Sequence, residues 1–259
     1  MKEVVIVSAV RSPMGRAHKG NFAYTRADDL AADVIRACLT KVPQVKPAEI
    51  ENFFLGCAMP EGEQGMNLAR NVVFLAGLPL SLPAGTLNNF CSSSLVTIML
   101  GAQGIMAGQG DIYLSGGVES MSHVPMGGYN PSLNPKLMQD GAPQAYISMG
   151  ITAENVAVKY NVTRQEQDAF ALSSHQKAVR AQKEGLFTKE IVSVTSYAQD
   201  GKTAQMVIDQ GPREDSSLEK LATLKPVFKE GGTVTAGNSS PLTDGASATL
   251  LMSADKAKE

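Results

Sequence analysis

The sequence predicts an α/β fold in which helices cover the faces of a layered sheet. Strand-like and helical stretches alternate as β-α-β-α-β-α-β from the N-terminus to Ser115, and this alternation is the signature of such folds. The apolar run from Val4 to Ser8 is typical of a strand that is covered on both sides. The stretch from Asn71 through Gly110 contains no Asp, Glu, Lys, Arg or His, which indicates a segment deep inside the protein.

The elements of this first part follow from local signals. Asp28 and Asp29 place two acids in the first turn of a helix, and Cys38 falls on the apolar face of that helix. Cys57 ends a strand, and both cysteines are predicted to be buried. Gly77 and the prolines beyond it close another helix. The predicted strands are 4–8, 53–57, 84–87 and 111–115, and the predicted helices begin at 28 and span 65–77 and 91–108. The last of these is apolar on every side and is therefore predicted to be buried on every side.

The character of the chain changes after Glu119. A stretch rich in Pro, Gly, Met and Asn predicts a loop over 121–144. Thr163 and Glu166 form a capping box, and Gly185 suits a C-terminal cap. The further predictions are helices over 152–160, 163–184 and 217–223, and strands over 191–195, 206–208 and 246–252. Because the last strand returns to the sheet pattern, we expect an α/β core formed by 1–118 plus 246–259, with 119–245 as an inserted domain.

Composition excludes several classes of function. The chain of 259 residues is 43% hydrophobic and 19% charged, with a net charge of -2, so a nucleic-acid partner is not expected. Its three cysteines include no Cys-x-x-Cys pair, which argues against a disulfide framework or a metal site and favours a reducing, cytoplasmic compartment. The N-terminus starts as a strand rather than a secretory signal. Gly77, Pro79 and Pro83 interrupt the uncharged run, so no membrane span is predicted.

Cys91 is the candidate nucleophile. It lies where a strand-like run ends and a helix begins, and the positive end of a helix together with its unpaired N–H groups favours a thiolate. The same N–H groups can hold an oxyanion. A buried, inert cysteine is the alternative. Two features favour reactivity: strand-to-helix corners are where open α/β sheets bind ligands, and the neighbouring asparagines and serines need polar partners.

Four segments resemble those of the thiolases, the acyl-CoA acetyltransferases. They are 88–94 (NNFCSSS), 115–122 (SGGVESMS), 149–157 (MGITAENVA) and 232–240 (GTVTAGNSS), the last continuing to Asp244-Gly245-Ala246. They occur in the family's order across nearly the whole chain. The resemblance implies a thiolase-like three-layer α/β/α half with a mixed five-stranded sheet and an inserted, mainly helical loop domain that binds coenzyme A (CoA).

The resemblance also implies roles for individual residues. Cys91 attacks the keto carbon of a 3-ketoacyl-CoA, acetyl-CoA leaves, and a second CoA removes the acyl group from the cysteine. Arg213 matches a position near the adenine and phosphates of CoA, and Phe228 matches an apolar wall for the nucleotide. Ala236 and Ser240 match positions that line the pantetheine channel, and Met149 matches a position that flanks the thiol end. The alternatives are a solvated surface arginine at Arg213 and core residues at Phe228 and Met149. Coenzyme A is a substrate here, and no cofactor is expected.

The chain departs from the family pattern in its second half. Thiolases carry a Gly-His-Pro loop, a Cys-x-Gly loop and an Asn-Glu-Ala-Phe loop there, and none of these occurs in this sequence. We therefore expect an N-terminal half that does not turn over substrate alone and that exposes a large apolar face of the helix from Cys91. The full-length enzyme is expected to be a homodimer or homotetramer in fatty acid metabolism.

Substrate length and enzyme class leave alternatives open. Short-chain thiolases carry a histidine where this chain has Ser148, so a broader 3-ketoacyl-CoA thiolase is favoured over a short-chain acetoacetyl-CoA thiolase. A ketoacyl synthase of the same superfold is a further alternative, disfavoured by the Thr-Ala-Glu-Asn and Thr-Ala-Gly-Asn segments. A non-catalytic CoA-binding or assembly module is the third.

Overall fold

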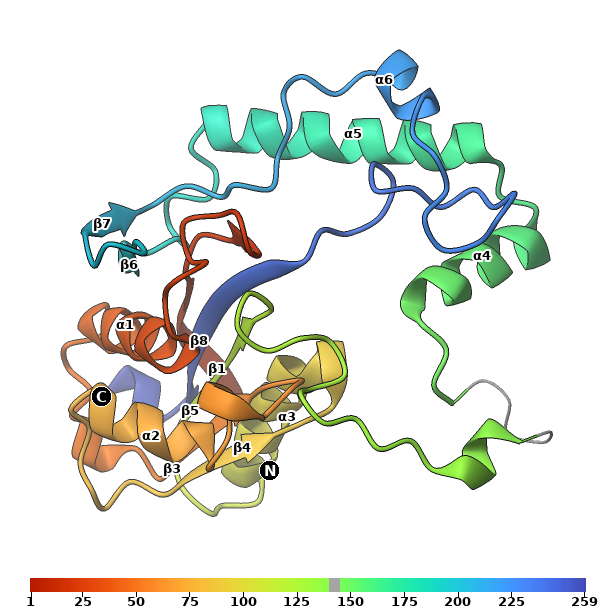
Figure 1. Ribbon diagram of the computed structural model, residues 1–259. Coiled ribbons are helices and arrows are strands. Elements are labelled where there is room, and N and C mark those ends of the chain that lie inside the picture. The colour runs from red at the N-terminus through yellow and green to blue at the C-terminus, as the bar shows by residue number, and fades with distance from the viewer. Residues whose placement is uncertain (140–144) are drawn as a thin grey trace. The chain divides into compact units, whose positions relative to one another are not determined.

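The computed structural model describes residues 1–139 and 145–259, which form two compact units (Figure 1). The first unit comprises Met1–Tyr129, Phe187–Gln210 and Leu242–Glu259, and the second comprises Asn130–Leu186 and Gly211–Pro241. Part of the predicted 121–144 loop, residues 140–144, lies outside the described residues. Segments 119–129, 187–210 and 242–245, which the sequence assigns to the insertion, fold with the first unit. The Arg11 guanidinium forms two hydrogen bonds with the Asp209 carboxylate, at 2.7 and 2.9 Å, and the Arg11 carbonyl accepts from the Val192 N–H.

The first unit is built on a mixed sheet, and the predicted α/β class is confirmed. Its strands are β1 (Val4–Arg11), β2 (Gly15–Arg16), β3 (Asn52–Gly56), β4 (Ala84–Leu87), β5 (Ile112–Ser120) and β8 (Thr243–Ser253). Five of them lie side by side in the order β1-β8-β5-β3-β4, and the two-residue β2 also pairs with β8. Strand β3 runs parallel to β4 and β5, whereas β8 runs antiparallel to β1 and β5. The carboxyl ends of β3, β4 and β5 therefore meet at one edge.

Alternating side chains divide the core into two layers. Ile112 and Leu114 of β5 belong to the large apolar cluster, while Tyr113 between them belongs to a second, smaller cluster. Because successive strand side chains point to opposite faces, the two clusters lie on opposite sides of the sheet. Helices α1 (Ala27–Thr40) and α2 (Leu68–Leu75) contribute to the large cluster, and α3 (Ser93–Met106) packs on the other face. Cys38 and Cys57 are buried in the large cluster, as predicted.

Helix α3 uses its small residues against the sheet. Ser93, Thr97, Gly101 and Gly104 are buried, and a methyl group added at Gly104 would lie 2.6 Å from the Tyr113 ring. The large residues Leu95, Met99 and Met106 are 59%, 49% and 43% exposed. The prediction that this helix is buried on every side is therefore wrong for the described chain, because the sheet covers only the side that carries these small residues and the buried Ile105. The prediction of an exposed apolar face is confirmed.

The second unit is mainly helical, with α4 (Met149–Tyr160), α5 (Arg164–Lys183) and the short α6 (Leu218–Ala222) (Figure 1). The predicted capping box at the start of α5 is confirmed, and Gly185 beyond its end has a φ of 68°.

The remaining elements of the two units are short. They are the 3-10 turns η1 (Pro47–Glu49), η2 (Gly62–Gln64), η3 (Phe90–Ser92), η4 (Pro135–Met138) and η5 (Lys256–Lys258), and the hairpin strands β6 (Val194–Tyr197) and β7 (Thr203–Met206). Within the described ranges, no helix combines the length and apolar character needed to cross a membrane.

Candidate active site

Cys91 lies in η3, the single turn between β4 and α3. Its side chain is exposed, whereas the other two cysteines of the sequence, both described, are buried. Burial raises the pKa of the Cys57 thiol to about 12, and the nearby negative charge of Glu119 acts in the same direction. Burial also raises the pKa of the Cys38 thiol. Of the three thiols, Cys91 is therefore the one open to a substrate.

A set of local hydrogen bonds shapes the turn that carries Cys91. Phe90 has a φ of 47°, which is uncommon for a residue other than glycine. Its N–H donates to Oδ1 of Asn88 at 2.8 Å. The Ser93 hydroxyl accepts from the Asn89 N–H at 2.8 Å and donates to the Phe90 carbonyl at 2.6 Å. The polar residues around the cysteine therefore bond to the backbone of its own turn.

Paired glycines of two neighbouring strands let the start of α3 approach the sheet. A methyl group at Gly56, the last residue of β3, would lie 2.6 Å from both the Ser93 carbonyl carbon and the Ser94 nitrogen. A methyl group at Gly117 of β5 would lie 1.9 Å from Oγ of Ser94. One turn further along, Oγ1 of Thr97 donates to the carbonyl of Gly116 at 3.1 Å. Cys91 thus sits at the edge where the parallel strands end, which is where open α/β sheets bind ligands.

Glu119, in the second of the four sequence segments, has a structural role at this edge. Its carboxylate accepts from the N–H of Ala58 at 2.7 Å and from Nε2 of Gln64 at 2.9 Å. Oε1 of the fully buried Gln64 in turn accepts from the N–H of Ser120 at 2.6 Å. These bonds tie the end of β5 to the segment that follows β3.

The other five predicted site residues all belong to the second unit. Met149 is exposed at the first position of α4, and Phe228 is partly exposed. The Phe228 ring lies against Gly150, the residue after Met149, because a methyl group at Gly150 would lie 2.1 Å from atoms of that ring. Ala236 and Ser240 are exposed on the 232–240 segment. Exposure of all four is compatible with a ligand surface.

Glu154 joins two of the predicted segments, and sequence reasoning did not single it out. Its carboxylate is buried and accepts from the N–H groups of Thr233 and Val234 at 2.9 and 2.8 Å. Burial raises the pKa of Glu154, but the hydrogen bonds from Val234 and Thr233 outweigh it and hold the pKa below its usual value. Asn238 continues the network through its amide, which donates to Oδ1 of Asp168 at 3.0 Å. The signal for Glu154 was an acid inside an otherwise uncharged motif.

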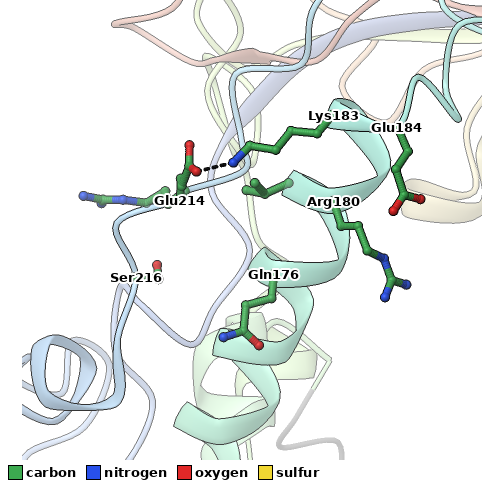
Figure 2. A pocket seen from close by; sticks show the side chains of 8 residues that line it. Gln176, Arg180, Lys183, Glu184, Glu214 and Ser216 are labelled. Atoms are coloured by element: carbon green, nitrogen blue, oxygen red, sulfur yellow. Dashed lines mark hydrogen bonds and ion pairs between the residues drawn. The ribbon is translucent and has the colours of Figure 1, made fainter.

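A pocket of about 370 Å³ lies against helix α5 (Figure 2). Arg213 is one of its lining residues. The lining residues are Gln176, Val179, Arg180, Lys183, Glu184, Arg213, Glu214 and Ser216. Three of them are cations, which suits phosphate groups. Two are acids, and exposed ion pairs join Lys183 to Glu214 and Nε of Arg213 to Asp215, the latter at 3.5 Å. An anionic ligand would have to displace these pairs, and exposed pairs are weak.

The three histidines form hydrogen bonds with groups other than Cys91. The ring of His123 lies between the Glu63 carboxylate, 2.8 Å from Nδ1, and the Ala23 carbonyl, 3.0 Å from Nε2. Nδ1 of His175 accepts from the N–H of Arg213 at 3.1 Å. The backbone N–H of His18 donates to Oγ of Ser122. In the part of the chain that the structure describes, no hydrogen bond joins a histidine to Cys91.

Comparison with known proteins identifies relatives of the whole chain. The family described as "Thiolase, N-terminal domain" matches residues 4–255. The chain is 47% identical to the 3-ketoacyl-CoA thiolase of Bacillus subtilis, covering 99% of this chain and 67% of that protein. It is 43% identical to the 3-ketoacyl-CoA thiolase of Idiomarina loihiensis, covering 100% and 67%. The crystal structure of the Bacillus anthracis acetyl-CoA acetyltransferase superposes with a TM-score of 0.87 at 36% identity, covering 100% of this chain and 67% of that one.

Proposed function

We propose, from the fact that this chain belongs to the thiolase family, that Cys91 accepts an acyl group in the exchange between a 3-ketoacyl-CoA and coenzyme A. The chain carries the family's N-terminal domain and spans about two thirds of the length of its relatives. The observation that carries the proposal is the exposed Cys91 thiol in η3, the turn directly before α3, where the parallel strands end. Neither of the other cysteines offers an accessible thiol.

The reaction has two steps. The Cys91 thiolate attacks the keto carbon at position 3, and N–H groups at the start of α3 stabilise the oxyanion. The bond between carbons 2 and 3 then breaks, its electron pair and a proton leave as acetyl-CoA, and an acyl-thioester remains on Cys91. The thiol of a second CoA attacks this thioester and releases its proton, which balances the proton taken up when acetyl-CoA formed. The shortened acyl-CoA leaves, and Cys91 returns to the thiolate. The family's proton-transfer groups are a histidine and a second cysteine in loops that this sequence lacks, so we expect acylation of the chain without repeated turnover.

We assign CoA binding to the second unit. The exposed Met149, Phe228, Ala236 and Ser240 are the surface we assign to the pantetheine and nucleotide, and Arg213 is the cation we assign to the adenine and phosphates. The Glu154 network supports this assignment, because it holds the segment with Ala236 and Ser240 against the helix that begins with Met149.

The acyl chain is expected to be longer than acetoacetyl. Where short-chain thiolases carry a histidine, Oγ of Ser148 accepts from the N–H of Ile151 at 3.3 Å and caps helix α4. A short-chain thiolase is the second candidate, favoured by the similarity to an acetyl-CoA acetyltransferase structure. A cytoplasmic location, a role in fatty acid metabolism and a dimeric or tetrameric full-length enzyme complete the proposal.

Mass spectrometry of the intact chain tests the function. We expect incubation with a 3-ketoacyl-CoA to add one acyl group, which peptide mapping assigns to Cys91 and which Cys91→Ala abolishes. Cys38 and Cys57 stay unmodified and serve as internal controls. Acetoacetyl-CoA and a long-chain 3-ketoacyl-CoA are compared to decide substrate length. CoA binding without acylation of Cys91 would contradict the proposal and favour a binding module.

A further inference from the structure

We propose that Ser93 is a positioning residue that holds Cys91 in its reactive orientation through the backbone of residues 89 and 90. This inference rests on the proposed role of Cys91 as the nucleophile. Ser93 lies two residues after Cys91 and contributes its side chain to the turn rather than to solvent, since it is only 4% exposed. Its hydroxyl is the buried polar group closest in sequence to the thiol.

The hydroxyl bonds to both sides of the turn at once. It accepts from the N–H of Asn89 at 2.8 Å and donates to the carbonyl of Phe90 at 2.6 Å, so its single proton and a lone pair are both used. Between these two contacts the backbone adopts the positive φ of Phe90. A bulky residue keeps such a conformation only when its surroundings enforce it. Since Phe90 directly precedes Cys91, its φ and ψ set the direction in which the cysteine leaves the turn.

Ser93 is also fixed to the sheet, which its neighbour Ser92 is not. The absence of a side chain at Gly56 lets the backbone and Cβ of Ser93 lie against the end of β3. Ser92 is exposed, and among the described residues its hydroxyl bonds to Asn89 alone, through the carbonyl and the side-chain amide at 3.0 Å each. Ser93 thus connects strand β3 to the turn of the nucleophile, and Ser92, which lacks the contact with β3, provides a matched control.

Alkylation by iodoacetamide, followed at each cysteine by mass spectrometry, tests this role. We expect Ser93→Ala to slow alkylation of Cys91 roughly tenfold, which corresponds to about 1.4 kcal/mol. Ser92→Ala should stay within about twofold of the unmodified chain. Acylation by a saturating 3-ketoacyl-CoA should slow by the same factor, while the concentration that half-saturates the reaction is unchanged. A Cys91 rate in Ser93→Ala equal to that of the original chain would overturn the inference, even if Cys91 is acylated as proposed.

A double variant separates positioning from a general loss of structure. Phe90→Gly frees the backbone at residue 90, because glycine adopts positive and negative φ with similar ease. If Ser93 acts by fixing this same backbone, the double variant Phe90→Gly with Ser93→Ala should lose less rate than the product of the two single losses. Independent, multiplying losses would refute a shared mechanism. If Ser93→Ala unfolds, Cys38 and Cys57 become alkylated, and Asn88→Ala then decides. Asn88 is exposed and bonds the N–H of Phe90 at 2.8 Å. We expect Asn88→Ala to slow Cys91 while the buried cysteines stay protected, and an unchanged Cys91 rate would overturn the proposal.

Discussion

Replacing Gly56 by alanine should displace the start of α3 and with it the candidate nucleophile. The added methyl group would lie 2.6 Å from the Ser93 carbonyl carbon and 2.6 Å from the Ser94 nitrogen. Both atoms are backbone, so neither can rotate away as the end of a flexible side chain could. Overpacking of this kind costs about 1–3 kcal/mol, and at about 2–4 °C per kcal/mol the unfolding midpoint should fall by about 2–12 °C.

Gly85 provides the matched control, because it lies on the neighbouring strand directly opposite Phe54 of β3. A methyl group there would meet its nearest atom, Cδ1 of Phe54, at 3.9 Å, which is an ordinary contact. Thermal unfolding and Cys91 alkylation are measured for both variants. We expect Gly56→Ala to lower the midpoint and slow alkylation, while Gly85→Ala leaves both near their original values. Equal behaviour of the two variants would refute the argument that α3 depends on a side-chain-free contact at Gly56.

Three further predictions concern other parts of the molecule. Glu154→Gln should cost about 1–3 kcal/mol in the free energy of unfolding, because an amide would aim a donor at N–H groups. Since the folded pKa of Glu154 is lowered, the stability that its carboxylate contributes is present at neutral pH and is lost as the pH falls below the ordinary value of 4.5. Unfolding curves in urea from pH 7 to pH 3 should show this loss of stability in the original chain and not in Glu154→Gln. Met99→Lys should reduce self-association in sedimentation velocity, whereas Gln103→Lys, at an exposed polar position of the same helix, should not; equal effects would contradict the apolar-face argument. Cys57, with a pKa of about 12, should resist alkylation up to pH 9 in the folded chain, and labelling there at the rate of Cys91 would contradict its burial.

Local signals in the sequence predicted much of the fold. The capping box of Thr163 and Glu166 and the glycine after α5 define that helix in the structure as they do in the sequence. The apolar runs of the central strands also located β3, β4 and β5, although β5 continues to Ser120. These features are set by neighbouring residues, which is why they could be read without knowledge of the tertiary structure.

Long-range contacts could not be predicted in the same way. The placement of 187–210 with the first unit depends on bonds from Arg11 to Asp209 and Glu190, which are 198 and 179 positions away in the chain. The strand expected over 206–208 lies instead at Thr203–Met206, where its register is set by pairing with β6. At the candidate site, the cysteine was identified from its position before a helix, but the roles of Gly56 and Ser93 became evident only from their contacts.

Helix α3 explains why a pattern with apolar residues on every side misled the prediction of its burial. Periodicity distinguishes apolar from polar faces, but the large apolar residues of this helix are distributed around all of its sides. The informative pattern was side-chain size. Gly101 and Gly104 lie on the side that meets Tyr113, and the absence of side chains there brings the helix axis close to the sheet. Close approach at one end of the helix fixes the other end, where Ser93 and Cys91 lie, so the small residues along α3 help to set the position of the thiol.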